Sequence, residues 1–344
     1  MKIAERGLEI NASRQFSSWL FEQKISISFT TYQAGKLFFI GIQDNGNLSI
    51  FERTFERCMG LYVKDRSLWI STLYQIWRFE NVLVEAQQYD GYDAQYVPQM
   101  SYVTGDIDIH DIAVDSDGMP VFVNTLFSCL AKPSATRSFE LLWKPPYISK
   151  LAAEDRCHLN GLAMKNGKPR YVSSIAQSDI SDCWRENRAT SGCLVDIESN
   201  EIISSGLSMP HSPRWYRDRL WLLNSGTGEF GFVDTNTGQF EAIAFCPGYL
   251  RGLAFIGDYA LVGMSKPRNN KTFQDLPLDS ILKEKSGKAR CGIGVIDLRT
   301  GDLVHTLRID GIISELYDVA VIPFVQKPMA IGFKSDEIRR FISV

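Results

Sequence analysis

Hydrophobic and polar positions alternate in short blocks along this chain, and one block recurs. Each copy has a short apolar stretch, a polar turn and a second stretch rich in β-branched or aromatic residues. Three copies contain histidine and begin at Asp108, His158 and His211, with the sequences DIHDIAVDSDG, HLNGLAMKNG and HSPRWYRDR. Four copies without histidine begin at Ser26, Cys58, Tyr249 and Glu315. Repeats of roughly 40–50 residues that each hold several strands predict an all-β fold, the β-propeller.

A second repeat supports this prediction. The segments VDIESNE, VDTNTGQ and IDLRTGD begin at Val195, Val233 and Ile296, each between apolar stretches. Each predicts a tight hairpin, in which the aspartate accepts hydrogen bonds from backbone amides further along and Gly or Asn adopts a left-handed conformation. Such a hairpin is expected between the outer two strands of a blade.

The seven block starts predict seven blades in one domain spanning residues 1–344, with six blades as the alternative. The last copy has too few residues for a whole blade. We therefore expect the N-terminal segment GLEIN, residues 7–11, to supply its missing strand and close the ring. Residues 13–24, SRQFSSWLFEQK, predict a short helix.

Two long segments, 175–192 and 265–290, interrupt the repeat. Both fall between the second and third predicted strands of a blade. On a rigid scaffold such loops commonly carry function, so we expect them to cover the mouth of the central channel. The alternative is that they are tolerated surface insertions.

Composition narrows the possible partners and the compartment. The net charge of −3 argues against a nucleic-acid surface. No apolar run reaches the roughly 20 residues that span a bilayer, and the N-terminus does not resemble a signal peptide. The seven cysteines include no CxxC pair. We therefore expect a cytoplasmic protein with reduced thiols, no nucleic-acid partner and no membrane partner. The oligomeric state is left open.

The histidines provide the main candidate chemistry. When the copies are aligned on an apolar residue near the start of each inner strand, side chains two residues apart point into the channel. This alignment places His110, His158, His211, Asp108 and Glu315 in one group. Three imidazoles with a carboxylate would suit a divalent transition metal, namely Mn, Fe, Zn or Cu. The alternative is a hydrogen-bonded set of channel residues that holds water, and His305 is expected to be structural.

Other polar residues are expected around the same mouth. The expected catalytic residues are Tyr317, Tyr249 and Arg251, with the tyrosines in proton transfer. The expected substrate-binding residues are Asn160, Arg214, Asn224, Ser225, Lys266, Arg268, Trp184 and Arg185. Arginine suits carboxylate or phosphate groups because its guanidinium binds two oxygens at once.

The run GLSMPHSPRWYRDRLWLLNSGTGEF, followed by PGYLRGLAF, GMSKPR and ELYDVAV, resembles a family of bacterial conserved hypothetical proteins whose function is unknown. The resemblance implies no activity. The ring of histidines therefore carries the functional expectation of a metal-dependent enzyme of the lyase, isomerase or oxygenase type. Its substrate would be a small anionic or carbonyl compound, a peptide or a sugar. The alternative is a non-catalytic scaffold that binds a protein or glycan partner.

Overall fold

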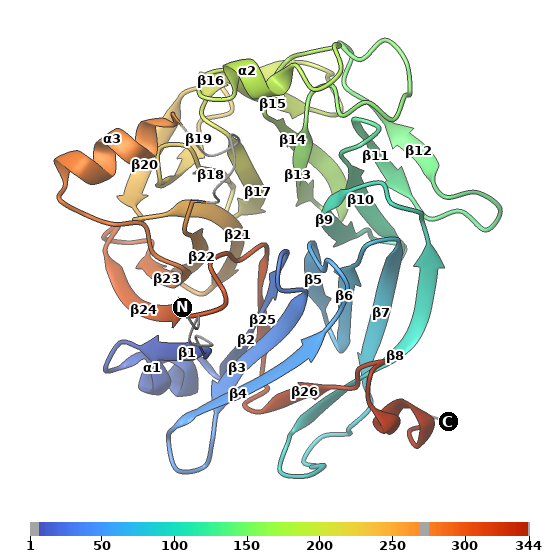
Figure 1. Cartoon of the computed structure of the whole chain (residues 1–344), viewed down its shortest axis with the longest axis vertical. Helices are drawn as coiled ribbons and strands as arrows, with labels where there is room; N and C mark the ends of the chain where they lie inside the picture. Colours follow the sequence, from blue (N-terminus) through green and yellow to red (C-terminus); the bar gives the residue numbers. More distant parts are fainter. Residues whose placement is uncertain (1–6, 268–274, 343–344) are drawn as a thin grey trace, which may run out of the picture.

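The chain folds into a ring of antiparallel sheets around a central axis (Figure 1). The computed structural model describes residues 7–267 and 275–342. Within these residues the strands form six sheets, so the β-propeller is confirmed and the sheets match the six-blade alternative rather than the preferred seven.

The first three blades, each from the innermost strand outward, follow the chain. They contain β5 (Leu61–Lys64), β6 (Ser67–Ser71), β7 (Gln75–Asn81) and β8 (Ala94–Val103); β9 (Ile109–Val114), β10 (Pro120–Asn124), β11 (Cys129–Lys132) and β12 (Glu140–Trp143); and β13 (Leu159–Lys165), β14 (Lys168–Ser174), β15 (Gly192–Asp196) and β16 (Ile202–Leu207).

The remaining blades complete the ring. They contain β17 (Pro210–Tyr216), β18 (Arg219–Asn224), β19 (Glu229–Val233) and β20 (Phe240–Phe245); β21 (Tyr249–Ile256), β22 (Tyr259–Ser265), β23 (Gly292–Asp297) and β24 (Leu303–Asp310); and β25 (Val319–Pro323), β2 (Ile25–Thr31), β3 (Lys36–Ile42) and β4 (Leu48–Thr54).

The two ends of the chain share the last blade. Strand β25 pairs with β2, with Val319 opposite Phe29 and Ile27 opposite Val321. The copies at Ser26 and Glu315 were expected to begin two separate blades. Ser26 lies instead in β2, the second strand of this blade, and Glu315 precedes β25, its inner strand. This pairing, and not the N-terminal segment, closes the ring.

Each terminus also adds a fifth strand at the outer edge of a sheet. Strand β1 (Glu9–Ala12) pairs with β24, so GLEIN extends the fifth blade instead of the last one. Strand β26 (Pro328–Ala330) runs parallel to β8. Both additions cover edges that would otherwise be free to pair with another chain.

The predicted hairpins and loops lie where the sequence placed them. The three hairpins join the third and fourth strands of their blades, and Asp196, Asp234 and Asp297 each accept a hydrogen bond from the amide two residues on, at 2.8–2.9 Å. The long segments lie between β14 and β15 and between β22 and β23. They contain helices α2 (Trp184–Asn187) and α3 (Pro277–Glu284).

The short helix expected near the N-terminus is α1 (Phe16–Gln23), and a 3-10 turn, η2 (Asp336–Arg339), follows β26. Helix α1 buries Phe16, Trp19 and Leu20. His305, on the outer strand β24, lies 5.6 Å from the Trp19 ring. No helix in the described part of the chain is long and apolar enough to cross a membrane.

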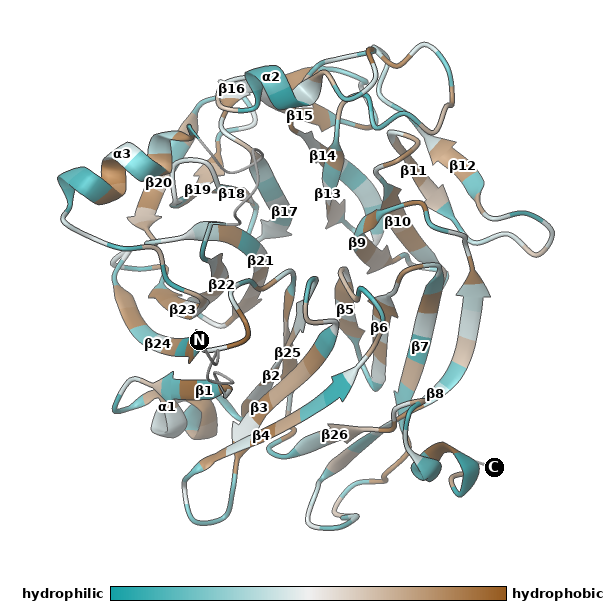
Figure 2. Cartoon of the chain, viewed as in Figure 1, coloured by the Kyte–Doolittle hydropathy of each residue, from teal (hydrophilic) through white to brown (hydrophobic). Residues whose placement is uncertain are grey.

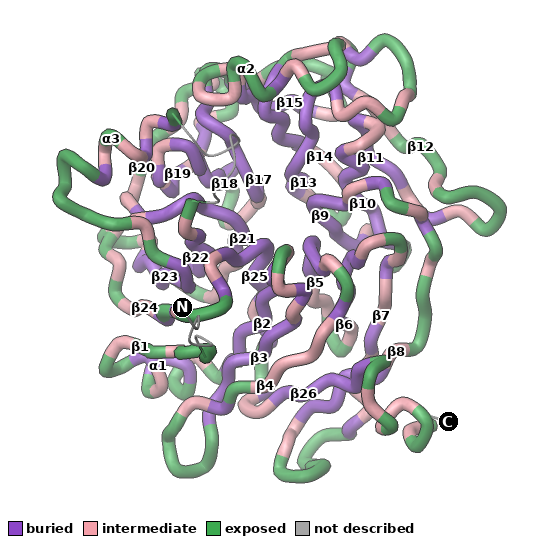
Figure 3. Tube along the Cα trace, in the orientation of Figure 1, coloured by how far each residue is buried: buried purple, intermediate pink, exposed green. Residues whose placement is uncertain are grey.

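The core consists of apolar side chains packed between neighbouring sheets. Figure 2 shows hydrophobic residues on the strands of every blade, and Figure 3 shows the inner strands as buried and the rim loops as exposed. Hydroxyl groups tie the blades together near the axis. At five of the six junctions, a Ser or Thr at the end of a second strand donates to a carbonyl at the start of the next inner strand: Thr30 to Met59, Ser71 to Ile109, Thr125 to Leu159, Ser225 to Leu250 and Ser265 to Leu316.

A second set of hydrogen bonds, from backbone amides to side chains, links the inner strands of neighbouring blades at alternate junctions. Asp318 accepts a hydrogen bond from the Leu61 amide at 3.0 Å, Asp111 from the Leu162 amide at 2.9 Å, and Ser212 from the Gly252 amide at 3.0 Å. The intervening blades carry glycine at the same position, where a Cβ would press on the following strand. At Gly252 a Cβ would lie 2.6 Å from the Val319 nitrogen.

Gly252→Ala is therefore expected to lower the free energy of unfolding by about 3 kcal/mol. The left-handed φ of +81° accounts for about half of this loss and the contact with Val319 for the rest. Gly46 is a matched control, because it has the same φ of +81° and no heavy atom within 4 Å of a Cβ. Urea unfolding of both variants measures the difference, and equal losses would contradict the role assigned to the close strand approach.

Candidate functional site

The start of each inner strand contributes one residue to a ring around the axis. Ile109, Leu159, Pro210 and Leu250 each pair with the last or next-to-last residue of the neighbouring second strand. The next residues in the four strands therefore occupy equivalent positions. After each of them come Gly, Ser or Asp and then an apolar residue or proline. This pattern identifies six axis residues, one per blade: Met59, His110, Asn160, His211, Arg251 and Tyr317.

This ring corrects the register expected from the sequence. The alignment grouped His211 with His158, but the equivalent of His211 is Asn160. The reason is that Pro213 stands at the position where the other strands have an apolar residue, such as Leu162 and Leu253. A β-bulge just beyond the first residues is common to all four of these strands. His158 belongs to a second ring nearer the mouth.

The mouth ring contains the residues two places before the axis ring: Arg57, Asp108, His158, Met209, Tyr249 and Glu315. Four of them have a left-handed backbone, with φ of 50° at Arg57, 56° at Asp108, 49° at His158 and 47° at Met209. Such conformations are uncommon for residues other than glycine and cluster at functional sites. The repeat of this conformation in four consecutive blades also reflects the shared turn that enters each inner strand.

His110 and His158 lie side by side although they come from different blades. Their ring centroids are 4.7 Å apart at an interplanar angle of 84°. The Tyr317 ring also lies close to His110, with ring centroids 5.6 Å apart. The His110 and His158 residues each keep 8% of their surface exposed.

His158 forms a dyad with an aspartate. Its Nδ1 lies 2.9 and 3.1 Å from the two Asp155 carboxylate oxygens, and the Trp184 indole N–H donates to the same carboxylate at 2.9 Å. The Trp184 ring stacks on the His158 ring at 4.0 Å. Burial would raise the pKa of Asp155, but His158 and the Trp184 N–H hold it below its usual range. An ionised Asp155 keeps the proton on Nδ1 and leaves Nε2 as the lone-pair nitrogen.

The other two histidines are held in the same tautomer. His211 Nδ1 donates to the Met209 carbonyl at 2.8 Å, and its buried Nε2 has no hydrogen-bond partner among the described residues. His110 Nδ1 lies 3.1 Å from the Asp108 carbonyl and 2.8 Å from the Thr125 hydroxyl. Since that hydroxyl donates to Leu159, it accepts from His110.

Burial keeps these two imidazoles neutral. It lowers the pKa of His110 to about 4, with His158 and Arg251 adding to the effect of burial. It also lowers the pKa of His211 well below its usual range, with the charge of Arg251 contributing. Neutral imidazoles with a free Nε2 can accept a proton or bind a metal.

The carboxylates expected as metal ligands have other partners. Asp108 pairs with Arg57 at 2.7 Å, and its Oδ2 lies 3.6 Å from His110 Nδ1, the nitrogen that does not carry the lone pair. Burial opposes ionisation of Asp108, yet His110, His158 and Arg57 lower its pKa. Glu315 accepts a hydrogen bond from the Gln33 amide at 2.7 Å. Across residues 7–267 and 275–342, no three His, Cys, Asp or Glu side chains meet with metal-site geometry.

The residues expected to be catalytic divide into two groups. Arg251 and Tyr317 belong to the axis ring, where the guanidinium carbon lies 5.0 Å from the centre of the Tyr317 ring. Tyr249 turns away from the axis, because its hydroxyl lies 3.4 Å from Asp279 on α3. It packs with Trp184, Met209, Leu278 and Leu282, so both long loops meet in one apolar cluster beside the channel mouth.

Several expected substrate-binding residues make contacts within the fold. Asn224 accepts a hydrogen bond from the Ser208 amide, and Ser225 is one of the hydroxyls that tie blades together. Lys266 pairs with Asp310 at 2.9 Å. Arg185 lies over the Trp184 ring, with its guanidinium carbon 4.3 Å from the ring centre, and Arg268 lies outside the described residues.

Arg214 also differs from the expectation. It lies deeper in the channel, where its guanidinium contacts Asp111 at 2.7 Å and Asp318 at 3.6 Å. The two aspartates, together with Asp155 and Thr125, contact the expected site residues and were not predicted from the sequence. A sequence signal for Asp111 and Asp318 was available. Each lies between an axis residue and an apolar residue, at a position where neighbouring blades have glycine. Nothing in the local sequence marks Asp155 as the partner of His158.

Comparisons with known proteins identify the family and the fold. A family model described as a domain of unknown function, DUF4915, matches residues 14–331, which confirms the resemblance to a family without an assigned function. No curated protein matches the chain. A chain of a nidogen/laminin complex is similar at a TM-score of 0.52 and 10% identity, over 87% of this chain and 99% of that one. Virginiamycin B lyase from Staphylococcus aureus gives a TM-score of 0.42 and 12% identity, over 75% and 96% of the two chains.

Proposed function

The chain belongs to the DUF4915 family, whose function is unknown, and for this member we propose an enzyme that transfers a proton on a small anionic or carbonyl-containing substrate at the channel mouth. The observation that carries the proposal is the Asp155–His158 dyad, with Nδ1 2.9 Å from the carboxylate and the ring fixed by Trp184. A carboxylate that fixes the tautomer and orientation of a histidine prepares Nε2 to act as a general base.

The neighbouring groups support this role. His110 lies beside His158 and is neutral because burial lowers its pKa to about 4. It can accept a hydrogen bond from the substrate or relay its proton. Arg251 lies on the axis next to Tyr317 and supplies positive charge where negative charge would develop on a carbonyl or carboxylate oxygen. Tyr317 would return a proton to the product.

The proposal predicts exchange of a substrate proton with solvent. We expect the protein, incubated in D2O with a defined mixture of 2-oxo acids, 2-hydroxy acids, amino acids and sugar phosphates, to add deuterium to at least one compound or to convert it. His158→Gln should reduce the rate by about 10²–10⁴-fold, because it removes the base. Mass spectrometry of the mixture measures the change.

His305→Gln is the matched control, since His305 lies on the outer strand β24 and packs on α1, and its replacement should leave the rate unchanged. A rate retained in His158→Gln would contradict the dyad as the base. No exchange or conversion of any compound would favour the non-catalytic scaffold that binds a protein or glycan.

A divalent transition metal is the second candidate, favoured by the three histidines that share the Nδ1–H tautomer. Metal-ligating histidines commonly donate this hydrogen to an oxygen and bind through Nε2. His110, His158 and His211 would have to shift to share one ion, since no metal-site geometry is present among the described side chains. Repeating the D2O experiment after EDTA treatment, with Mn, Fe, Zn or Cu restored afterwards, separates the metal-dependent enzyme from the metal-independent one.

A further inference from the structure

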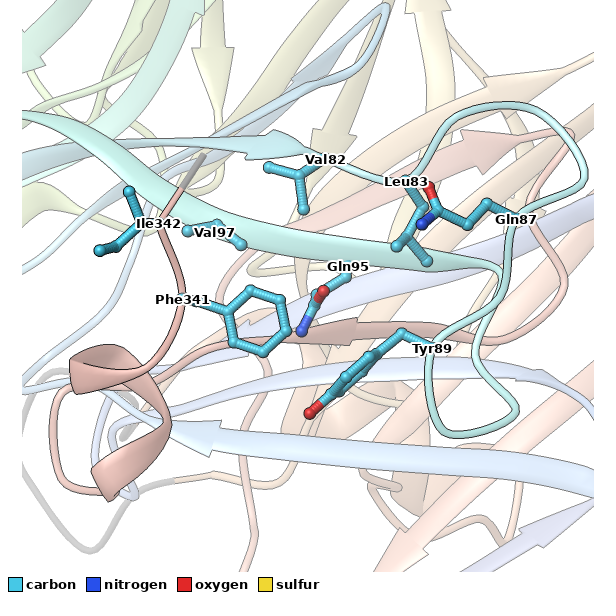
Figure 4. A pocket seen from close by; sticks show the side chains of 8 residues that line it. All are labelled: Val82, Leu83, Gln87, Tyr89, Gln95, Val97, Phe341 and Ile342. Carbon is cyan, nitrogen blue, oxygen red and sulfur yellow. The ribbon is translucent and has the colours of Figure 1, made fainter. Parts of the chain in front are cut away.

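A small pocket lies on the outer part of the first blade, away from the channel. Strand β8, the loop before it and the C-terminal segment enclose about 270 Å³. Its lining consists of Val82, Leu83, Gln87, Tyr89, Gln95, Val97, Phe341 and Ile342 (Figure 4). None of these side chains carries a charge, so the pocket suits a neutral ligand.

Gln95 is the unusual residue of this pocket. It is fully buried, and neither its side-chain nitrogen nor its side-chain oxygen has a hydrogen-bond partner among the described residues. Its backbone is satisfied, because its amide donates to Asn81 at 2.9 Å and its carbonyl accepts from Val82 at 3.0 Å. Buried polar groups are nearly always paired, so an unpaired amide with both a donor and an acceptor requires an explanation.

The Gln95 amide is directed into the pocket. Its neighbours Ala94 and Tyr96 point to the opposite face of β8 and join the core between two blades. Figure 4 shows the amide beside the rings of Phe341 and Tyr89. These two rings meet edge to face at 5.0 Å and 90°.

We propose that this pocket binds a neutral, planar lactam, a ring that carries an N–H donor beside a carbonyl acceptor. The carboxamide of glutamine presents one N–H and one C=O side by side, so a lactam edge can satisfy both at once. The aromatic rings and valines supply apolar walls for the ring of the ligand. Ligand pockets commonly hold about 300–1,000 Å³, so this volume suits a single ring.

Binding of 2-pyridone and of toluene to the full chain tests the proposal. The two probes have rings of the same size, and only 2-pyridone has the donor–acceptor pair. We expect calorimetry or ligand-observed NMR to give 2-pyridone at least a tenfold lower Kd than toluene, because a site built around polar groups rejects a ligand that leaves them unpaired. Gln95→Met keeps the side-chain volume and should abolish this preference. It should also raise the Tm without ligand, because it removes a buried unpaired amide.

Tyr89→Ala is the second variant, since Tyr89 is 41% exposed and its loss does not threaten the core. It should weaken both probes alike. Equal affinity of the native protein for both probes, a preference that survives in Gln95→Met, or no binding of 2-pyridone at millimolar concentration would each overturn the proposal. None of these outcomes depends on the histidine site.

Discussion

Arg214→Ala is expected to lower the free energy of unfolding by about 3–5 kcal/mol, because it leaves two carboxylates buried without their cation. Arg214 Nη1 and Nη2 lie 2.7 and 3.2 Å from the two oxygens of Asp111, and Nη2 lies 3.6 Å from Asp318. Asp111 is 3% exposed and Asp318 is 2% exposed. Both aspartates also accept amides from neighbouring strands, so neither can turn toward solvent.

The loss should depend on pH. Burial raises the pKa of Asp318, and Arg214 opposes that rise. Arg214→Ala removes the positive charge that lowers the pKa of Asp318, so this pKa should rise further. A carboxyl whose pKa is higher in the folded state stabilises the fold at low pH and loses that contribution as the pH rises. The variant should therefore be less impaired at pH 5 than at pH 8, measured by urea unfolding.

Two further proteins complete this experiment. Arg214→Met combined with Asp111→Asn and Asp318→Asn removes the charges together and should recover much of the stability, because the unpaired charge causes most of the loss. Arg217→Ala removes an exposed arginine that pairs with Asp258 at the surface, and little change is expected. A loss below about 1 kcal/mol in Arg214→Ala would contradict the assigned role of Arg214.

Acid destabilisation through the channel histidines is the second large effect. The pKa of His110 is lowered to about 4 in the folded protein, against about 6.5 in an unfolded chain. A histidine with a lowered pKa contributes stability above pH 6.5 and loses it as the pH falls toward 4. For His110 this amounts to roughly 3 kcal/mol, and His211 adds to it in the same direction.

His110→Asn tests this dependence, because the asparagine amide can still donate to the Asp108 carbonyl but does not titrate. Urea unfolding at pH 7.5 and pH 4.5 should show a smaller loss in the variant than in the native protein. His305→Asn should retain most of the native loss, since His305 is only partly buried. The assignment would be wrong if His110→Asn and the native protein lost the same free energy over this interval.

Local patterning along the chain was enough to predict the fold class, the aspartate hairpins, the N-terminal helix and the position of both long loops within their blades. Each of these features depends on neighbouring residues, such as the side chain of Asp196 bonding its own turn. The presence of histidines at inner-strand starts was also readable from the repeat.

Blade count, register and the partners of the site residues were decided only by the tertiary structure. Ring closure pairs β25 with β2, which are nearly 300 residues apart, so two copies of the repeat merge into one blade. The register predicted for the His211 strand was wrong because Pro213 stands where other inner strands have an apolar residue such as Leu162, so His211 is equivalent to Asn160 and not to His158. The stacking of His158 on Trp184 depends on how the long loop folds back over its own blade, and the pairing of Arg214 with Asp111 joins two blades that only the ring brings together.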